Sequence, residues 1–220
     1  MCAANRNGPP ATAGSKGIFL MRLIYFDFPG RGAAIRDALR LGGVPFEDVR
    51  ISYPDFCARR AAGELPWDTL PVVELPDGTR LGQSNAILRW AGALAGLTPP
   101  NPSDALRVDD LLDNIEDYGA RVSVSIRVVS DEVRAQLRAE LAQRWLPEWF
   151  ALLERRLAAA GQGWLAGAAL SVADLKAMHL IDKLINGSLS GLQPDALAAF
   201  PTLSAWHLRV HALRVHRHLE

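Results

Sequence analysis

Residues 22–32 read RLIYFDFPGRG and decide the fold class of this chain. The first residues of this stretch are apolar and β-prone, which predicts a strand over Met21–Phe26. Pro29-Gly30 then provides turn chemistry, and Gly32–Leu41 has the apolar spacing of a helix. Tyr25 is therefore expected where the first strand gives way to the first helix. In α/β units, ligands collect at the carboxyl ends of strands.

The next sixty residues alternate between strand and helix patterns. We expect strands over Phe46–Ile51 and Pro71–Leu75, a further strand from Arg80-Leu81 after the hairpin turn Asp77-Gly78, a partly helical stretch over Pro54–Gly63, and a helix over Ser84–Ala95. The order is β-α-β, an irregular linker, then β-β-α. This order predicts an α/β fold with a four-stranded mixed sheet and helices packed on it.

The second half of the chain has only helical patterns. The proline-rich stretch 98–102 separates it from the first half, as a linker between domains does. Pro147 is expected to bend one helix, and Ser171-x-x-Asp174 has the form of a capping box that opens another. We therefore expect a disordered extension over 1–20, an α/β domain over 21–97, a linker over 98–103 and an all-α domain over 104–220.

Composition excludes several classes of function. The 220 residues contain 24 Lys and Arg and 24 Asp and Glu, so no general attraction to nucleic acid is expected. No apolar run approaches the length of a membrane span. Two cysteines, Cys2 and Cys57, form no disulfide framework, which favours a reducing, cytoplasmic location. Residues 1–17 lack the apolar core of a secretory signal, although Arg6 and Lys16 leave a transit peptide open.

Four features of the first half indicate a ligand with a thiol and two carboxylates. Tyr25 offers a hydroxyl donor, and Gln83-Ser84 opens a helix whose free N–H groups suit a carboxylate. Arg60, beside Arg59, offers a cation for a second carboxylate. Pro71 opens a strand; if its peptide bond is cis, the neighbouring backbone groups are exposed to an extended peptide. A small peptide with a central thiol satisfies all four features, with Tyr25 donating to the sulfur.

These residues resemble the motifs of the cytosolic glutathione transferases, most closely the sigma class, which includes a glutathione-dependent prostaglandin D synthase. The matching stretches are Leu23–Asp27, Gly30–Gly32 with Ile35-Arg36, Leu70–Val72, Gln83–Ile87 and Ser171–Leu175. The resemblance covers the chain from about Met21 to its end. It implies a thioredoxin-like N-terminal domain that binds glutathione, an all-helical C-terminal domain and a homodimer.

The resemblance also implies roles for individual residues. Tyr25 matches the catalytic tyrosine, and Arg31 matches an arginine that supports the thiolate. The backbone at Leu70-Pro71 would hold the cysteinyl group of glutathione, and Gln83-Ser84 would hold its γ-glutamyl carboxylate. Asp117 matches an acidic residue that reaches glutathione bound by the other subunit.

Two positions depart from the family pattern at the glycyl end of glutathione. Phe56 stands where the family often has tryptophan, and it has no indole N–H to donate. Arg60 keeps the positive charge of a family lysine, but Asp68 adds a negative charge nearby. For the second substrate, a small electrophilic apolar molecule, we expect walls from Phe28, Tyr118 and Val122.

The predicted activity is conjugation of glutathione to an electrophilic carbon. A glutathione-dependent isomerase and a non-catalytic relative, such as a lens crystallin or an elongation-factor domain, remain as alternatives. Gly30-Arg31-Gly32 does not continue into a dinucleotide fingerprint, and Cys57 lies in the irregular linker, so it is read as an incidental thiol.

Two further charge patterns are read as surface features. Asp109, Asp113, Glu116 and Asp117 form an acidic stripe at helical spacing, which is usually a solvated helix face. His207 and His211 are four residues apart, as metal ligands on a helix can be. No carboxylate or cysteine stands at a matching spacing, so a basic surface helix is favoured and no metal is expected.

Overall fold

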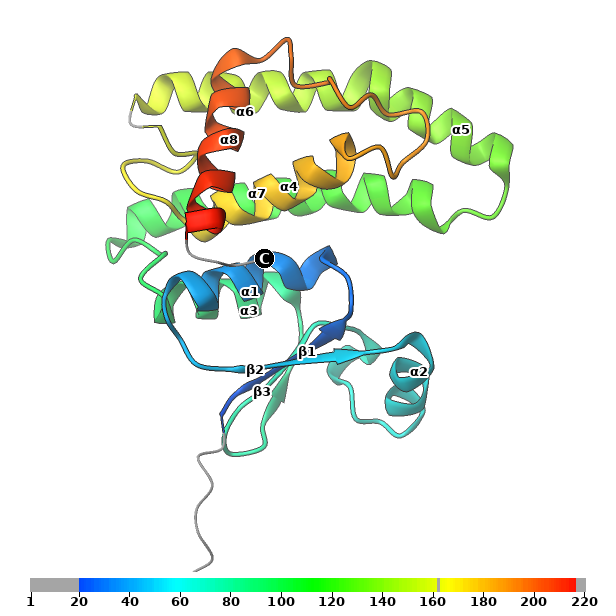
Figure 1. The fold of residues 1–220 in the computed structure, drawn as a ribbon, viewed down its shortest axis with the longest axis vertical. Coiled ribbons are helices and arrows are strands. Elements are labelled where there is room, and N and C mark those ends of the chain that lie inside the picture. Colours follow the sequence, from blue (N-terminus) through cyan, green and yellow to red (C-terminus); the bar gives the residue numbers. More distant parts are fainter. Residues whose placement is uncertain (1–19, 162, 217–220) are drawn as a thin grey trace, which may run out of the picture.

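The structure, a computed structural model, describes residues 20–161 and 163–216. The expected extension, with Cys2, Arg6 and Lys16, therefore lies almost entirely outside the described residues. The first half of the chain forms one sheet of four strands in the order β2-β1-β3-β4 (Figure 1). The strands are β1 (Arg22–Phe26), β2 (Glu47–Ile51), β3 (Val72–Glu74) and β4 (Arg80–Leu81). Because β1 is parallel to β2 and antiparallel to β3, the predicted four-stranded mixed sheet is confirmed.

The register of the central strands gives the sheet two apolar faces. Leu23 lies opposite Val73, and both side chains join the main core of the molecule. Ile24 lies opposite Val72, and both join a smaller core on the other face, with Phe56 packed against it. Side chains alternate along a strand, so one short apolar run supplies both faces. Tyr25 shares the parity of Leu23, but near the end of β1 its ring no longer meets the main core and packs with the smaller core instead.

The helices of the first half are α1 (Ala33–Leu41), α2 (Tyr53–Ala61) and α3 (Ser84–Leu94). Helices α1 and α3 lie between the sheet and the helical domain, whereas α2 lies apart, beside β2 (Figure 1). The stretch expected to be partly helical is thus a complete helix. Ser52 and Asp55 form a capping box at its start, the same sequence signal that was used at Ser171.

The rest of the described chain is helical, as predicted. Its α-helices are α4 (Pro102–Arg127), α5 (Asp131–Glu140), α6 (Leu146–Ala160), α7 (Val172–Ile185) and α8 (Pro201–His216). The expected disturbance at Pro147 takes the form of a π-helical turn over Leu141–Trp145, which joins α5 to α6. Proline lacks the N–H that a regular helix needs, and a wider turn accommodates its absence. No described helix has both the length and the apolar character needed to cross a membrane.

Helix α7 is the centre of the helical domain and the link to the sheet domain. It contacts α4 and α8 in its own domain and α1 and α3 in the other. The capping box at its start is confirmed: the Asp174 carboxylate accepts hydrogen bonds from the backbone N–H and the hydroxyl of Ser171. It also accepts from the N–H of Leu165 and the indole N–H of Trp206. One carboxylate thus joins the start of α7, the preceding loop and α8.

Candidate active site

Tyr25 is held by the turn that follows β1. Its side chain is only 6% exposed, and its hydroxyl oxygen accepts a hydrogen bond of 2.9 Å from the backbone N–H of Arg31. Gly30 and Gly32 pack directly on the phenol. A Cβ at Gly30 would overlap the hydroxyl, and a Cβ at Gly32 would lie 2.8 Å from ring atom Cδ1. The glycines of this turn therefore make room for the Tyr25 ring.

Burial raises the pKa of Tyr25 above its ordinary value, although the Arg31 N–H and the charges of Arg31 and Arg36 oppose the shift. The phenol is therefore neutral at physiological pH. A neutral hydroxyl can accept and donate at once. The N–H of Arg31 uses it as an acceptor, and its own proton remains for a ligand.

Arg36 holds the turn after β1 in place, a role that the sequence did not reveal. The guanidinium is 5.6 Å from the centre of the Tyr25 ring and is almost fully buried. It donates to the Asp48 carboxylate at 2.8 Å and to the backbone carbonyls of Phe26 and Phe28. Phe26 ends β1 and Phe28 lies in the turn after it. Because Arg36 bonds to both carbonyls, it fixes the path of the chain around Tyr25.

Arg31 links the turn to the helical domain. Its guanidinium forms an ion pair of 2.6 Å with Glu116 of α4. The other oxygen of Glu116 accepts from Lys176 of α7 at 2.7 Å, and Lys176 also donates to the Asn85 side chain of α3. Burial lowers the pKa of Lys176, and the bond to Glu116 opposes the shift. Asp117, the acidic residue chosen from the sequence, is exposed one position further along α4.

The acidic stripe on α4 is partly exposed to solvent, as expected, but three of its side chains also pair with the sheet domain. Asp109 and Asp113 both pair with Arg89 of α3, at 2.6 and 2.9 Å. Asn85 also donates to Asp113 at 3.0 Å. The stripe supplies polar contacts between the two domains. These contacts depend on where the sheet domain packs, so the sequence of α4 alone does not show them.

Gln83 and Ser84 stand at the start of α3, as expected. Gln83 precedes the helix with φ 72° and ψ 105°, and no side-chain cap covers the first turn. A positive φ is uncommon for a residue with a Cβ and is often found at binding sites. The free N–H groups of the first turn form a place for an anion.

The α2 side of the site is built differently. Phe56 packs edge-to-face on Phe26, with ring centres 5.4 Å apart, and so belongs to the smaller core. Arg60 and Asp68 are both exposed and lie 3.9 Å apart, so Asp68 partly balances the charge of Arg60. The peptide bond Leu70-Pro71 is cis, as predicted, and lies directly before β3.

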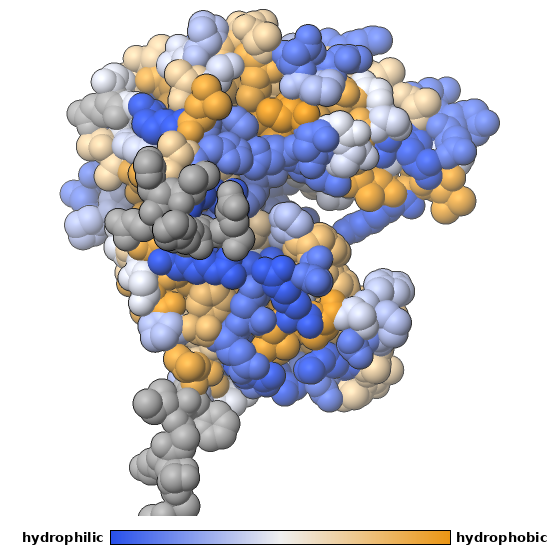
Figure 2. Space-filling view, viewed as in Figure 1, coloured by the Kyte–Doolittle hydropathy of each residue, from blue (hydrophilic) through white to orange (hydrophobic). Residues whose placement is uncertain are grey.

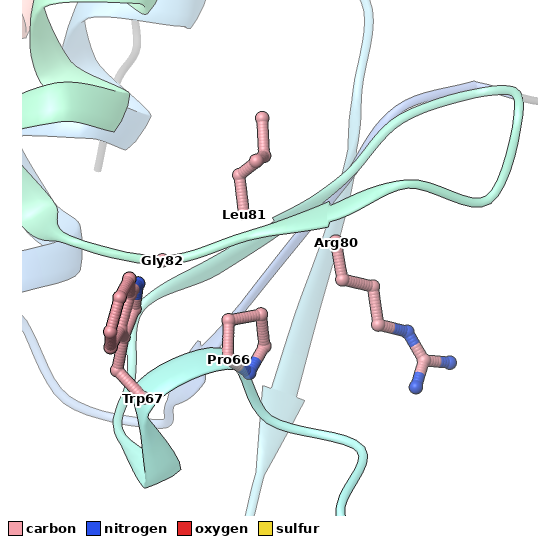
Figure 3. A pocket seen from close by; sticks show the side chains of 5 residues that line it. All are labelled: Pro66, Trp67, Arg80, Leu81 and Gly82. Carbon is pink, nitrogen blue, oxygen red and sulfur yellow. The ribbon is translucent and has the colours of Figure 1, made fainter.

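A shallow hollow of about 430 Å³ flanks Gln83, lined by Pro66, Trp67, Arg80, Leu81 and Gly82 (Figure 3). Trp67 is 74% exposed and has φ 59°. Its indole stands beside Gly82, where a Cβ would lie 3.0 Å from ring atom Cδ1. No sequence pattern singles out Trp67.

The residues expected to line the second-substrate site do not share one environment. Phe28 is exposed and stacks on Phe26, with ring centres 5.3 Å apart. Tyr118 is half-buried and stacks on Trp149. Val122 is 3% exposed and packs in the main core, so its assignment to a substrate wall is wrong. Helical spacing placed Tyr118 and Val122 on one face, but that face turns into the core at Val122.

The space-filling view shows a hollow between the two domains, on the side where α2 lies (Figure 2).

The helical half of the chain matches a known protein family. Residues 116–215 match the family Glutathione S-transferase, C-terminal domain. Glutathione S-transferase 1 of Ascaris suum is 31% identical over 197 residues, which cover 86% of this chain and 90% of that protein. This chain therefore belongs to the glutathione S-transferase family. It is a transferase, and its co-substrate is glutathione.

Two solved structures show the same fold. Prostaglandin synthase D of Nilaparvata lugens superposes with a TM-score of 0.78 at 27% identity, over 87% of this chain and 92% of that one. A monomeric glutathione S-transferase of the hookworm Necator americanus has a TM-score of 0.75 at 26% identity, over 88% of this chain and 92% of that one. The thioredoxin-like and all-helical architecture is therefore confirmed.

Proposed function

We propose that Tyr25 donates a hydrogen bond to the sulfur of bound glutathione, and that the resulting thiolate adds to an electrophilic carbon of an apolar co-substrate. The observation that carries this proposal is the state of the Tyr25 hydroxyl. It is buried, neutral and already hydrogen-bonded as an acceptor by Arg31, so it has a proton to donate. It lies at the carboxyl end of β1, where ligands of α/β units bind.

The chemistry follows from the acidity of the thiol. A free thiol has a pKa of about 8.5, so little thiolate exists at neutral pH. A hydrogen bond to the charged form lowers that pKa, and each unit is worth about 1.4 kcal/mol. The thiol proton leaves to solvent, and the sulfur electron pair forms the new C–S bond. At the same carbon, the bond to a leaving group such as chloride breaks and the group departs with its electron pair, or a π bond opens and its electron pair takes a proton from solvent. The charge of Arg31 adds to the stabilisation of the thiolate.

The rest of glutathione would run from α3 to α2. Gln83, Ser84 and the free N–H groups of α3 would hold the γ-glutamyl carboxylate. The backbone at Leu70-Pro71 would hold the cysteinyl group. Arg60 would hold the glycyl carboxylate, without an N–H from Phe56 and against the charge of Asp68.

Replacement of Tyr25 by phenylalanine tests the proposal. We expect Tyr25→Phe to keep glutathione binding, to lower turnover about 100-fold, and to raise the pKa of the bound thiol by about one unit or more. Thiolate absorbance titrated against pH measures that pKa. Tyr53→Phe is the matched control, because Tyr53 is an exposed tyrosine of α2. An unchanged thiol pKa in Tyr25→Phe would disprove the mechanism.

The ionisation of Tyr25 itself gives a second check. Because its pKa is raised, the phenol should stay protonated as the pH passes about 10, where an ordinary tyrosine ionises. The ultraviolet difference between wild type and Tyr25→Phe follows this titration directly. A tyrosinate signal near neutral pH would make Tyr25 a base and contradict its role as donor.

A glutathione-dependent isomerase is the second candidate, because the similar structure of Nilaparvata lugens is a prostaglandin synthase D. Isomerisation regenerates glutathione, whereas conjugation consumes it. Product analysis with a chloronitrobenzene and with a prostaglandin endoperoxide therefore separates the two. The same similarity supports the sigma class. A non-catalytic relative is disfavoured, since Tyr25, Arg31, Gln83 and Ser84 are all present.

We also propose a cytoplasmic homodimer. Trp67 and Leu81 are exposed apolar side chains that line the hollow beside the proposed glutathione site, and exposed apolar surface is typical of interfaces. Asp117 is exposed and free to reach a partner's site. Analytical ultracentrifugation of wild type and Trp67→Ala tests this: we expect a dimer that the substitution weakens. A wild-type monomer, like the Necator americanus relative, would contradict the proposal.

A further inference from the structure

Helices α7 and α8 bring two histidines and one carboxylate together away from the glutathione site. Asp182 comes from α7, and His207 and His211 come from successive turns of α8. His207 is only 8% exposed, so its expected place on a surface helix is wrong. The carboxylate that the sequence around the histidines lacks is supplied by the neighbouring helix.

The three side chains converge on one point. The Nε2 atoms of His207 and His211 each lie 2.8 Å from the same oxygen, Oδ1 of Asp182. One ligand atom from each residue lies within 4.8 Å of the other two. In a tetrahedral zinc site with bonds of about 2.0–2.1 Å, ligand atoms stand about 3.3 Å apart. Each histidine nitrogen therefore needs to move only about 0.5 Å from the Asp182 oxygen to reach the spacing of zinc ligands.

Asp182 is partly open to solvent. Its side chain is 28% exposed and that of His211 is 35% exposed, so solvent reaches the cluster from one side. A water molecule has access to a fourth coordination position.

We propose that Asp182, His207 and His211 bind a divalent transition metal of the zinc type, with water as the fourth ligand. Two imidazole nitrogens and one carboxylate oxygen form a common zinc donor set. The metal clamps α8 onto α7. This clamp reaches the sheet domain, because Arg214 of α8 forms an ion pair of 2.7 Å with Asp37 of α1.

A neighbouring cluster shows what distinguishes the proposed site. His179 of α7 also lies 2.7 Å from a carboxylate oxygen, that of Asp37. There, however, the Arg214 guanidinium occupies a position near the same oxygen, and its fixed positive charge repels a metal cation. His179 thus resembles His207 in its hydrogen bond but has no second imidazole beside it in the described part of the chain. It provides the control for the experiment.

The test is a titration of untagged full-length protein with Zn²⁺, measured by calorimetry, and with Co²⁺, measured by its visible absorption. A His216→Gln, His218→Gln background removes the other two histidines of α8 and the C-terminus. We expect one metal ion per chain and the intense visible bands of tetrahedral Co²⁺. His211→Gln and Asp182→Asn should each weaken binding at least tenfold, whereas His179→Gln should not change it.

The substitutions separate a metal site from a hydrogen-bonded cluster. His211 is the preferred target, since it is the more exposed histidine and its loss disturbs packing least. Circular dichroism of each variant confirms the fold before titration. Metal binding that is absent in the wild type, or that persists unchanged in His211→Gln, overturns the proposal. Equal loss in His179→Gln would also overturn it, because binding would then not depend on this cluster.

Discussion

The Tyr25 side and the Arg60 side of the proposed glutathione site differ in how firmly their residues are held. Around Tyr25, two glycines fit the ring, Arg31 bonds the hydroxyl, and buried Arg36 fixes the turn. Around Arg60, the groups that would meet the other end of glutathione are exposed, and a carboxylate competes for the cation. We infer from this comparison that the proposed chemistry at the sulfur depends on fixed geometry, whereas the proposed glycyl end would be held by an exposed charge that water screens.

The largest expected effect lies on the rigid side. Gly30→Ala would push a methyl group into the Tyr25 hydroxyl, and we expect turnover to fall about 100-fold. Gly43→Ala is the matched control, because Gly43 also has a positive φ but no atom near its Cβ position. The positive φ should cost each variant about 1 kcal/mol of unfolding free energy in chemical denaturation, and Gly30→Ala should lose more because its methyl group also clashes with Tyr25. Equal turnover in the two variants would break the comparison.

A substitution at Gln83 tests whether the unusual backbone conformation at this position contributes to glutathione binding. Gln83→Gly would remove the side chain that we propose holds the γ-glutamyl carboxylate, and would relax the positive φ. We expect glutathione to bind about tenfold more weakly, while the free energy of unfolding rises by about 1 kcal/mol. Calorimetry and denaturant titration measure the two quantities. Weaker binding accompanied by lower stability would show that the unusual backbone at Gln83 is not strained.

Glu116 and Asp117 are adjacent acidic residues with different expected roles. Glu116→Gln would leave Lys176 without its ion-pair partner, and we expect a loss of about 1–2 kcal/mol in unfolding free energy. Asp117→Asn should leave stability unchanged and weaken glutathione binding only in the dimer. Denaturant titration and calorimetry on both variants distinguish these roles. A stability loss in Asp117→Asn would place it in the domain interface instead.

The smallest effect on glutathione binding is expected on the exposed Arg60 side of the site. Asp68→Asn would remove the negative charge beside Arg60, and we expect glutathione to bind about twofold more tightly at low salt. The gain should disappear at high ionic strength, because both side chains are exposed. Asp195→Asn, the same charge change on an exposed loop of the helical domain, is the control. A tenfold change from Asp68→Asn would show that this side is as tightly organised as the other.

Local sequence patterns were sufficient to predict most of the fold. The strand before Pro29, the helix start at Ser84 and the capping box of Ser171 and Asp174 each depend on neighbours within a few residues. Such interactions are visible in the chain itself. The residues that could not be predicted interact across domains or between distant helices.

Arg36, Glu116 and Val122 illustrate that limit. Helical spacing says which side chains share a face, but not which element covers that face. The pattern of α4 alone therefore did not show that Glu116, and not its neighbour Asp117, pairs with Arg31 and Lys176, since the two differ by one position on the helix. Val122 was misplaced for the same reason.

The sequence by itself determined the order of elements, the place of Tyr25 at the end of the first strand and the turn that surrounds it, because these depend on backbone propensities and nearest neighbours. Only the tertiary structure decided that Arg31 meets Glu116, that the acidic stripe joins the domains and that Asp182 meets His207 and His211. Those contacts join residues far apart in the chain. Their geometry is set by how α4, α7 and α8 pack, and packing depends on the shape of every core residue at once.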